Sequence, residues 1–358
     1  MTNPEQIHKS IFSRLRLALC ASMLGLLFLT GCREQAGSAK DAAAPGAKQW
    51  KVALVLPGQI NDKGWNENGY HALMAIKDKL GAKVFFSEAT PMVNWERVIR
   101  GFCDDGCDIV ILHGLEFEDA AMKYAKEYPE TIFLVSNAGK GNEVNFFVLD
   151  IRSPESAFLT GVLAGLQPDV KKASAIVAFE YPLLVSQAEA FRYGFRCANP
   201  DSTSNLVVIG TFHDTVAAKE AAIAQINAGA DVIWQLADTA GLGIIQAASE
   251  HKTWVIGWGF DQSPLAPDVV LTTQKVDLSY AIVDTVGDIM DGSFENASRS
   301  YGVGTPATGL GPVNAKVDPA TVEQVERWRA AIADGVVDIP GMIGMGESQT
   351  LPLLSLPE

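Results

Sequence analysis

The residues best suited to chemistry lie in short loops that follow apolar runs. The loop at 61–66 places two asparagines, an aspartate and a tryptophan soon after the apolar run at 52–56. Aromatic rings and carboxylates recur at 114–117, 179–182, 237–239 and 258–262, and a Gln-Lys pair stands at 274–275. Aromatic faces stack on flat rings and carboxylates accept hydrogen bonds, so we expect a site for a flat ligand with a polar edge. The candidate ligand-binding residues in these loops are Asn61, Asp62, Trp65, Asn66, Glu116, Tyr181, Asp238, Trp258, Asp261 and Lys275.

Several of these residues also have plain structural interpretations. Asp is a favoured N-cap, and Asp62 and Asp238 each precede an expected helix, so capping and ligand binding stay equally good explanations for both. Trp65 follows a turn glycine at a strand-to-helix loop, which favours a place in the binding site over packing alone. Asp261 suits a structural loop carboxylate, and His113 suits an ordinary strand-end residue.

The sequence lacks the motifs of common enzyme classes. It has no Gly-x-Gly-x-x-Gly loop after the first expected strand, no Gly-x-Ser-x-Gly elbow and no Gly-x-x-x-x-Gly-Lys-Ser/Thr loop. Cys103 and Cys107 suit either a small disulfide or two inert thiols. None of the five histidines clusters with them, so we expect no metal, and no cofactor motif is present. A protein that is not an enzyme is favoured, with an exported α/β enzyme as the weaker alternative.

Short apolar runs alternate with helical stretches, which indicates an α/β fold of parallel sheets covered by helices on both faces. The expected strands are 52–56, 82–86, 109–113, 132–136, 145–149, 174–178, 206–211, 231–236, 254–258 and 269–273. The expected helices include 65–80, 117–127, 186–197, 217–228 and 242–250. The segment 106–136 is similar to 229–259, and such a repeat predicts two similar doubly wound lobes.

The chain is long enough for two cores, which sets the expected domain organisation. We expect a first lobe at 50–171 plus about 277–305, a second lobe at 172–276 plus about 312–340, and a tail at 341–358. Ligands of parallel sheets bind at the carboxyl ends of strands, so the predicted site lies in a cleft that closes about a hinge between the lobes.

The N-terminus is typical of an export signal. Basic residues precede the uncharged stretch at 17–31, which ends as Leu-Thr-Gly-Cys and is too short for a comfortable transmembrane helix. This ending resembles the lipobox of bacterial lipoproteins, which implies a signal peptide at 1–31 and lipidation of Cys32. Small and polar residues at 32–49 are typical of a tether. The net charge of −14 argues against a nucleic-acid partner.

Four segments in order, at 61–73, 158–165, 229–234 and 255–262, resemble the basic membrane protein family. Its members are lipoprotein substrate-binding components of ABC importers, typified by purine nucleoside receptors with a periplasmic binding protein type I fold. The resemblance implies a monomer anchored in a bacterial cell envelope. It would capture a small molecule and deliver that molecule to an ABC permease. A ligand-sensing co-receptor of the same fold remains an alternative.

The resemblance also assigns roles to single residues. The loop at 61–66 matches the family's first loop at both asparagines and the aspartate, with Trp65 in place of a phenylalanine. Tyr70 occupies the position that stacks on the purine, and Lys275 matches a lysine that approaches ribose. Gly259 replaces an aspartate that contacts ribose hydroxyls, and the Asp238-Thr pair resembles the branch that binds purine bases. A purine base is therefore expected in preference to its nucleoside.

Overall fold

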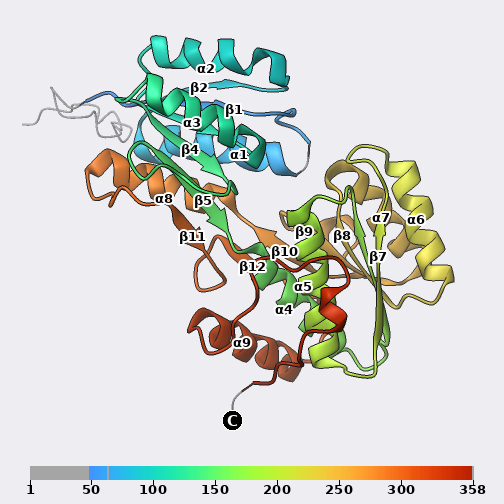
Figure 1. The fold of residues 1–358 in the computed structure, drawn as a ribbon. Coiled ribbons are helices and arrows are strands. Elements are labelled where there is room, and N and C mark those ends of the chain that lie inside the picture. Colours follow the sequence, from blue (N-terminus) through green and yellow to red (C-terminus); the bar gives the residue numbers. More distant parts are fainter. Residues whose placement is uncertain (1–47, 63, 357–358) are drawn as a thin grey trace, which may run out of the picture. The chain divides into compact units, whose positions relative to one another are not determined.

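The computed structural model describes residues 48–62 and 64–356 (Figure 1). The expected signal peptide at 1–31, the lipidation site Cys32 and most of the expected tether lie outside the described residues. Within the part of the chain that is described, no helix is both long enough and apolar enough to cross a membrane.

The first sheet has six parallel strands in the order β11-β5-β4-β3-β1-β2. Its strands are β1 (Lys51–Val55), β2 (Lys83–Ser87), β3 (Ile109–Leu112), β4 (Ile132–Ser136), β5 (Phe146–Ile151) and β11 (Arg299–Tyr301). Alternate side chains of a strand point to opposite faces, and β1 contributes Val52 and Leu54 to one core and Ala53 and Val55 to another. Both faces of this sheet are therefore buried.

The second sheet repeats this arrangement in the order β12-β10-β9-β8-β6-β7. Its strands are β6 (Lys172–Val177), β7 (Thr203–Val208), β8 (Val232–Leu236), β9 (Trp254–Gly259), β10 (Val270–Val276) and β12 (Thr308–Leu310). Only the edge strand β12 is antiparallel among these described strands. The two sheets confirm the expected α/β fold, and each of the ten expected strands overlaps one of them.

Helices cover both faces of each sheet (Figure 1). The helices are α1 (Trp65–Ala75), α2 (Trp95–Asp104), α3 (Glu118–Glu127), α4 (Ser153–Gly165), α5 (Pro182–Ala198), α6 (Thr215–Asn227), α7 (Asp238–His251), α8 (Leu278–Asp291) and α9 (Pro319–Ala333). On the first sheet α1 and α8 share one core, and α2 and α3 lie in the other. On the second sheet α4 and α5 cover one face, and α6 and α7 cover the other.

Helices α4 and α5 cross very closely. A Cβ on Gly161 would lie 2.0 Å from the backbone oxygen of Phe191, and one on Gly194 would lie 2.0 Å from that of Phe158. Glycine at both positions lets the two backbones touch. Although α4 falls within 50–171, it packs mainly against α5, β10 and β12 of the second sheet. The expected lobe boundaries remain a prediction.

The chain passes between the two sheets three times, before β6, after β10 and between β11 and β12. Near the second crossing the Asn68 side chain donates a hydrogen bond to the backbone oxygen of Val276 at 2.6 Å. This bond ties α1 of the first lobe to the end of β10 in the second.

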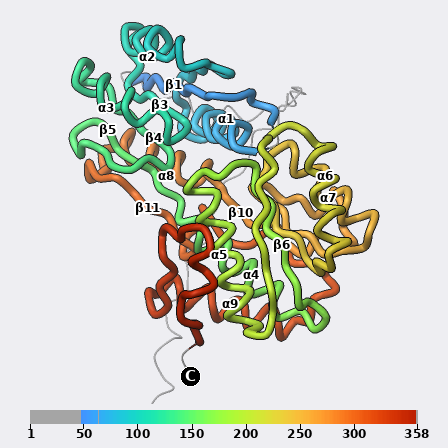
Figure 2. The backbone as a smooth tube through the Cα atoms, turned by 45° about the vertical axis from the view of Figure 1, so that its right-hand side comes forward, coloured from blue at the N-terminus to red at the C-terminus, as the bar shows by residue number. Residues whose placement is uncertain are grey.

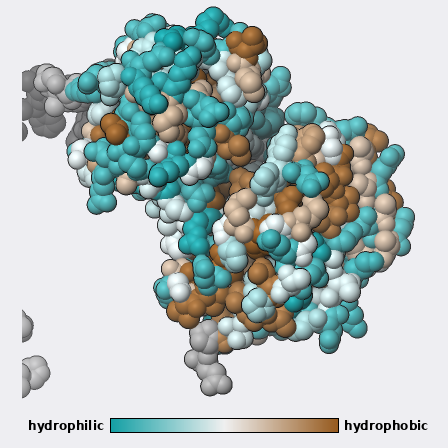
Figure 3. Space-filling view, viewed as in Figure 1, coloured by the Kyte–Doolittle hydropathy of each residue, from teal (hydrophilic) through white to brown (hydrophobic). Residues whose placement is uncertain are grey.

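The segment after residue 340 packs along α5, as the dark red trace in Figure 2 shows. The backbone amide of Ile343 donates to Ser186 Oγ at 2.9 Å, and the Tyr193 hydroxyl donates to the backbone oxygen of Pro352 at 2.5 Å. In Figure 3 the visible face of the first lobe is largely hydrophilic, whereas apolar residues gather on the second lobe around α5 and this segment. Residues 343 and 352 are thus bonded to α5, and the expected boundary of the tail at 341–358 stays a prediction.

Candidate ligand-binding site

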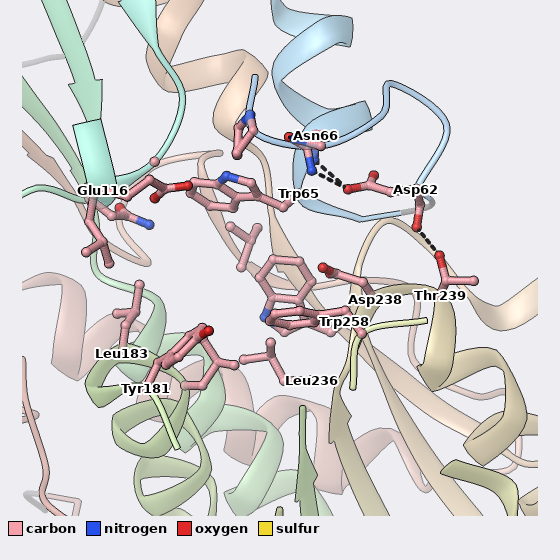
Figure 4. A pocket seen from close by; sticks show the side chains of 18 of the residues that line it. Asp62, Trp65, Asn66, Glu116, Tyr181, Leu183, Leu236, Asp238, Thr239 and Trp258 are labelled. Atoms are coloured by element: carbon pink, nitrogen blue, oxygen red, sulfur yellow. Dashed lines mark hydrogen bonds between the residues drawn. The ribbon is translucent and has the colours of Figure 1, made fainter. Parts of the chain in front are cut away.

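A cavity of about 860 Å³ lies between the two lobes, at the carboxyl ends of their parallel strands (Figure 4). Its first wall comes from the loops after β1, β3 and β4 and includes Trp65 and Glu116. Its second wall comes from the start of α5, the loop after β7, the start of α7 and the end of β9, and includes Tyr181, Asp238 and Trp258. The volume is within the range of small-molecule sites.

Most of the sequence-predicted binding residues meet in this cavity. The lining includes Asn61, Asp62, Trp65, Asn66, Glu116, Tyr181, Asp238 and Trp258. Three others lie outside the described lining. Tyr70 is five residues beyond Trp65, which places it about 140° round the helix, and its ring packs edge-on against Phe86 at 5.2 Å.

The side chains of the remaining two residues contact groups close by in the sequence. Asp261 is exposed after β9 and accepts a hydrogen bond from the amide of Ser263 at 2.9 Å. The Lys275 ammonium lies 3.5 Å from a carboxylate oxygen of Asp277. Neither the loop carboxylate nor this lysine is among the described cavity residues.

The His113 ring stacks on one face of the Trp65 indole and fixes its position. The two rings stack with centroids 4.4 Å apart, and the indole N–H donates to the backbone oxygen of His113 at 3.2 Å. His113 is fully buried; its Nε2 lies 2.8 Å from the backbone oxygen of Trp65, and its Nδ1 lies 3.3 Å from Ser136 Oγ. Burial lowers the pKa of His113 to about 4, so the ring is neutral and donates through Nε2. One face of Trp65 is thus covered by a residue that the sequence left as an ordinary strand end.

The Asp62 carboxylate is fully used in building the loop before α1. It accepts hydrogen bonds from the amides of Gly64, Asn66 and Glu67 at 2.9–3.0 Å and from Asn66 Nδ2 at 2.7 Å. Asn66 Oδ1 in turn accepts from the amide of Gly58 at 2.9 Å. These bonds show that Asp62 caps the helix, since they satisfy orphan amides of the first turn; its role in ligand binding stays a prediction.

Asp238 reaches across from the second lobe to the same loop. A Cβ on Gly64 would lie 2.3 Å from an Asp238 carboxyl oxygen, so only glycine permits this approach. Next to it, Thr239 Oγ1 donates to the backbone oxygen of Asp62 at 2.8 Å. Burial, and then the neighbouring Asp62 charge, raise the pKa of Asp238 to about 7. A backbone hydrogen bond from Trp65 acts in the opposite direction and lowers this pKa. Asp238 has a left-handed φ of 45°, a strained conformation that clusters at functional sites.

A buried polar network fixes Trp258 in the second wall. The indole N–H of Trp258 donates to Gln187 Oε1 at 3.1 Å, and Gln274 Nε2 donates to the same oxygen at 2.9 Å. Gln274 Oε1 accepts from the indole N–H of Trp234 at 3.0 Å. Gln187 lies on α5 and was not predicted, because a single glutamine on an amphipathic helix carries no sequence signal.

Glu116 and Tyr181 complete the site on the side away from Asp238. The Glu116 carboxyl folds over Gly114, where a Cβ would lie 2.3 Å from one of its oxygens. Partial burial in the cleft raises the pKa of Glu116. Tyr181 stacks on Phe179 at 5.3 Å, and Phe212 packs against Phe179 at 5.1 Å, which gives this part of the wall an apolar aromatic surface.

Cys103 and Cys107 are free, buried thiols of the first lobe, away from the described cavity. Burial raises their pKa values to about 12 and 11, which leaves both unreactive at neutral pH. Of the two explanations left open for this pair, the structure shows inert thiols. Across the described residues, no group of three or more His, Cys, Asp or Glu side chains is arranged to hold a metal ion.

The chain is similar to proteins of known class. It is 26% identical over 302 residues to basic membrane protein A1 of Borrelia garinii subsp. bavariensis, covering 81% of this chain and 88% of that one. A purine-binding protein of Brucella abortus is 24% identical over 271 residues, covering 75% and 77%. A solved structure of an ABC transporter solute-binding protein from Conexibacter woesei has a TM-score of 0.69 and 26% identity, covering 82% and 99%.

These likenesses identify the architecture and the family. The two-lobed arrangement is the type I periplasmic binding protein fold, as the resemblance implied. The model of the family described as PnrA-like ABC transporter substrate-binding proteins matches residues 49–342, most of the chain. The protein therefore belongs to that family of ABC transporter substrate-binding proteins.

Proposed function

We propose that this protein is a lipid-anchored receptor that captures a purine base in the interlobe cavity and delivers it, unchanged, to an ABC permease. The observation that carries the proposal is the pair of indoles, Trp65 from the first lobe and Trp258 from the second, in one cavity with carboxyl groups at its margins. Indole faces bind flat rings, and carboxylates accept from ring N–H and amino groups.

The choice of a base over a nucleoside follows from β9. Gly259 ends this strand with a left-handed φ of 84° and has no side chain, at the position where nucleoside receptors of the family carry a ribose-binding aspartate. A buried ribose hydroxyl left without a partner costs about 1–3 kcal/mol. The purine-binding relative from Brucella abortus supports the same class of ligand.

The proposal also covers the cellular setting. The Leu-Thr-Gly-Cys ending before residue 33 supports a lipid anchor on Cys32 in a bacterial envelope. Family membership supports an ABC permease as the partner and a role without catalysis. The exported protein would then act as a monomer outside the cytoplasm.

Calorimetry on the delipidated protein with adenine, guanine, hypoxanthine and their nucleosides tests this function. A bound base should also raise stability by about 2.7 kcal/mol at a hundredfold excess over Kd. Chromatography of the ligand after incubation should recover it unchanged. Failure of every purine to bind would refute the proposal, and a nucleoside that binds tenfold more tightly than each free base would refute the preference for bases.

Two variants link the binding to the indole. Trp65→Ala should weaken binding by about 0.5–1.5 kcal/mol beyond the loss of buried area, because the stacking face is removed. Tyr128→Ala is the control, since this aromatic residue directly follows α3 and lies outside the described cavity lining, and it should leave Kd unchanged.

A further inference from the structure

The polar groups that line the cavity differ in how much bonding capacity remains for a ligand. The indole N–H groups of Trp65 and Trp258 already donate to His113 and Gln187. The Asp62 carboxylate and the Asn66 amide are bound within the loop that starts α1. These four residues therefore shape the walls, and they offer a ligand little beyond the faces of the two indole rings.

Two carboxyl groups keep free acceptor positions. Within the described residues, the backbone amide of Trp65 acts on the Asp238 carboxyl group and the amide of Glu116 acts on its own carboxyl group, and no other donor group bonds to either. A carboxylate has about four lone-pair sites, so each retains capacity for a ligand donor. No ion pair joins either carboxyl to a lysine or arginine within the described residues. Their acceptor sites are thus neither filled nor neutralised by a described partner.

The two carboxyl groups approach the cavity from different lobes. Glu116 follows β3 in the first lobe, and Asp238 begins α7 in the second. In Figure 4 their oxygens point into the pocket from opposite sides, with the indole of Trp65 extending between them. A flat ligand lying against that indole would present one edge to each carboxyl group.

Free purine bases have donors on two such edges. The six-membered ring carries an amino group or a ring N–H, and the five-membered ring carries N9–H. In a nucleoside the sugar replaces the N9 hydrogen, so one of the two donors is lost. When a nucleoside binds, it displaces water from the carboxyl group that faces N9 but offers no N–H in return. The loss of this charged hydrogen bond weakens binding about tenfold or more.

We propose that Glu116 and Asp238 each accept an N–H from an opposite edge of a free purine base, and that the carboxyl group facing N9 makes the cavity select bases over nucleosides. This inference rests on the proposed function and adds the residues that set its specificity. Selection of bases over nucleosides then has two causes: a carboxyl acceptor that requires N9–H, and the absence of a ribose contact at Gly259.

Adenine and 9-methyladenine test the inference, because a methyl group removes N9–H without adding a sugar. We expect the wild-type protein to bind 9-methyladenine at least about tenfold more weakly than adenine. Glu116→Gln and Asp238→Asn keep the side-chain shapes but replace one acceptor oxygen by a donor amide. One of these two variants should bind adenine more weakly and reduce the ratio of the two Kd values to within about threefold, while the other keeps the ratio.

Asp201→Asn is the matched control, since this exposed carboxylate between α5 and β7 lies outside the described cavity lining and should leave both affinities and their ratio unchanged. Melting curves of all variants confirm folding before titration. Equal binding of adenine and 9-methyladenine by the wild type overturns the inference and leaves the proposed function intact. A ratio that persists in both carboxyl variants also overturns it, because the methyl group would then act by steric exclusion. Absence of binding to every purine refutes the proposed function itself.

Discussion

Replacing Asp238 by asparagine is expected to stabilise the ligand-free protein at neutral and alkaline pH. Burial of this carboxyl in the folded protein, and then the neighbouring Asp62 charge, raise its pKa from 3.8 to about 7. The unfolded chain releases the proton near pH 4, so wild-type stability is lost as the pH rises from about 4 to 7. Asparagine carries no charge to bury, and it tolerates the left-handed φ of 45° at this position.

The size of the effect follows from the shift in pKa. One pKa unit corresponds to about 1.36 kcal/mol, and the shift spans about three units, so the variant should gain up to about 4 kcal/mol at pH 8. At pH 4 the folded state keeps the proton and the unfolded chain holds it nearly half of the time, so the linked difference should shrink to about half a kcal/mol. The dependence on pH, rather than the gain at one pH, is the signature of the buried charge.

Thermal and urea unfolding of the wild type and Asp238→Asn at pH 4, 6 and 8 measures this difference. Asp169→Asn, at an exposed position between α4 and β6, is the control and should change stability by less than about 0.5 kcal/mol at each pH. A variant no more stable than the wild type at pH 8, or a gain that is the same at pH 4 and pH 8, would refute the reasoning about Asp238.

Three further outcomes are expected. Gly161→Ala should destabilise the protein by about 3 kcal/mol in urea unfolding, because its Cβ meets the backbone of α5; Gly101→Ala, with open space around its Cβ, should stabilise by up to about 1 kcal/mol. His113→Leu should lower stability by about 1–3 kcal/mol and weaken ligand binding, because the backbone oxygen of Trp65 loses its donor; exposed His71→Leu should do neither. Binding of a base by the wild type should weaken by up to tenfold per unit as pH falls below about 7, since protonated Asp238 no longer accepts freely. Calorimetry at pH 5 to 8 checks this, and a pH-independent Kd would contradict it.

The fold was largely predictable because its strands are short, apolar and separated by amphipathic helices. Helix α4 escaped prediction because all of its residues are buried, which leaves no polar face to mark a helical period. Strands β11 and β12 have only three residues each, too few for an alternating pattern. Both also lie far in sequence from the strands they pair with, so local sequence carries no sign of the pairing.

The position of the cavity was predictable from the sequence, but the bonding of each residue that lines it was not. The rule that ligands meet the carboxyl ends of parallel strands located the loops that contain Trp65 and Asp238. Residue type could not show that the Asp62 carboxylate is filled by four N–H groups, since a capping aspartate and a ligand-binding one are the same residue. Nor could it show that His113 supports Trp65, because the two are 48 positions apart and meet only through packing.

The three crossings between the sheets limit how this protein can be divided. A fragment that ends at residue 171 would lack β11 and α8, which come from 278–301. Strand β5 would then be an open edge, and the apolar face of α1 that packs on α8 would be bare, which are both features of aggregating fragments. Simple truncation therefore cannot yield an isolated first lobe. Expression of that lobe alone would need residue 151 joined to residue 278 by a short linker, with all the strands of the second sheet left out.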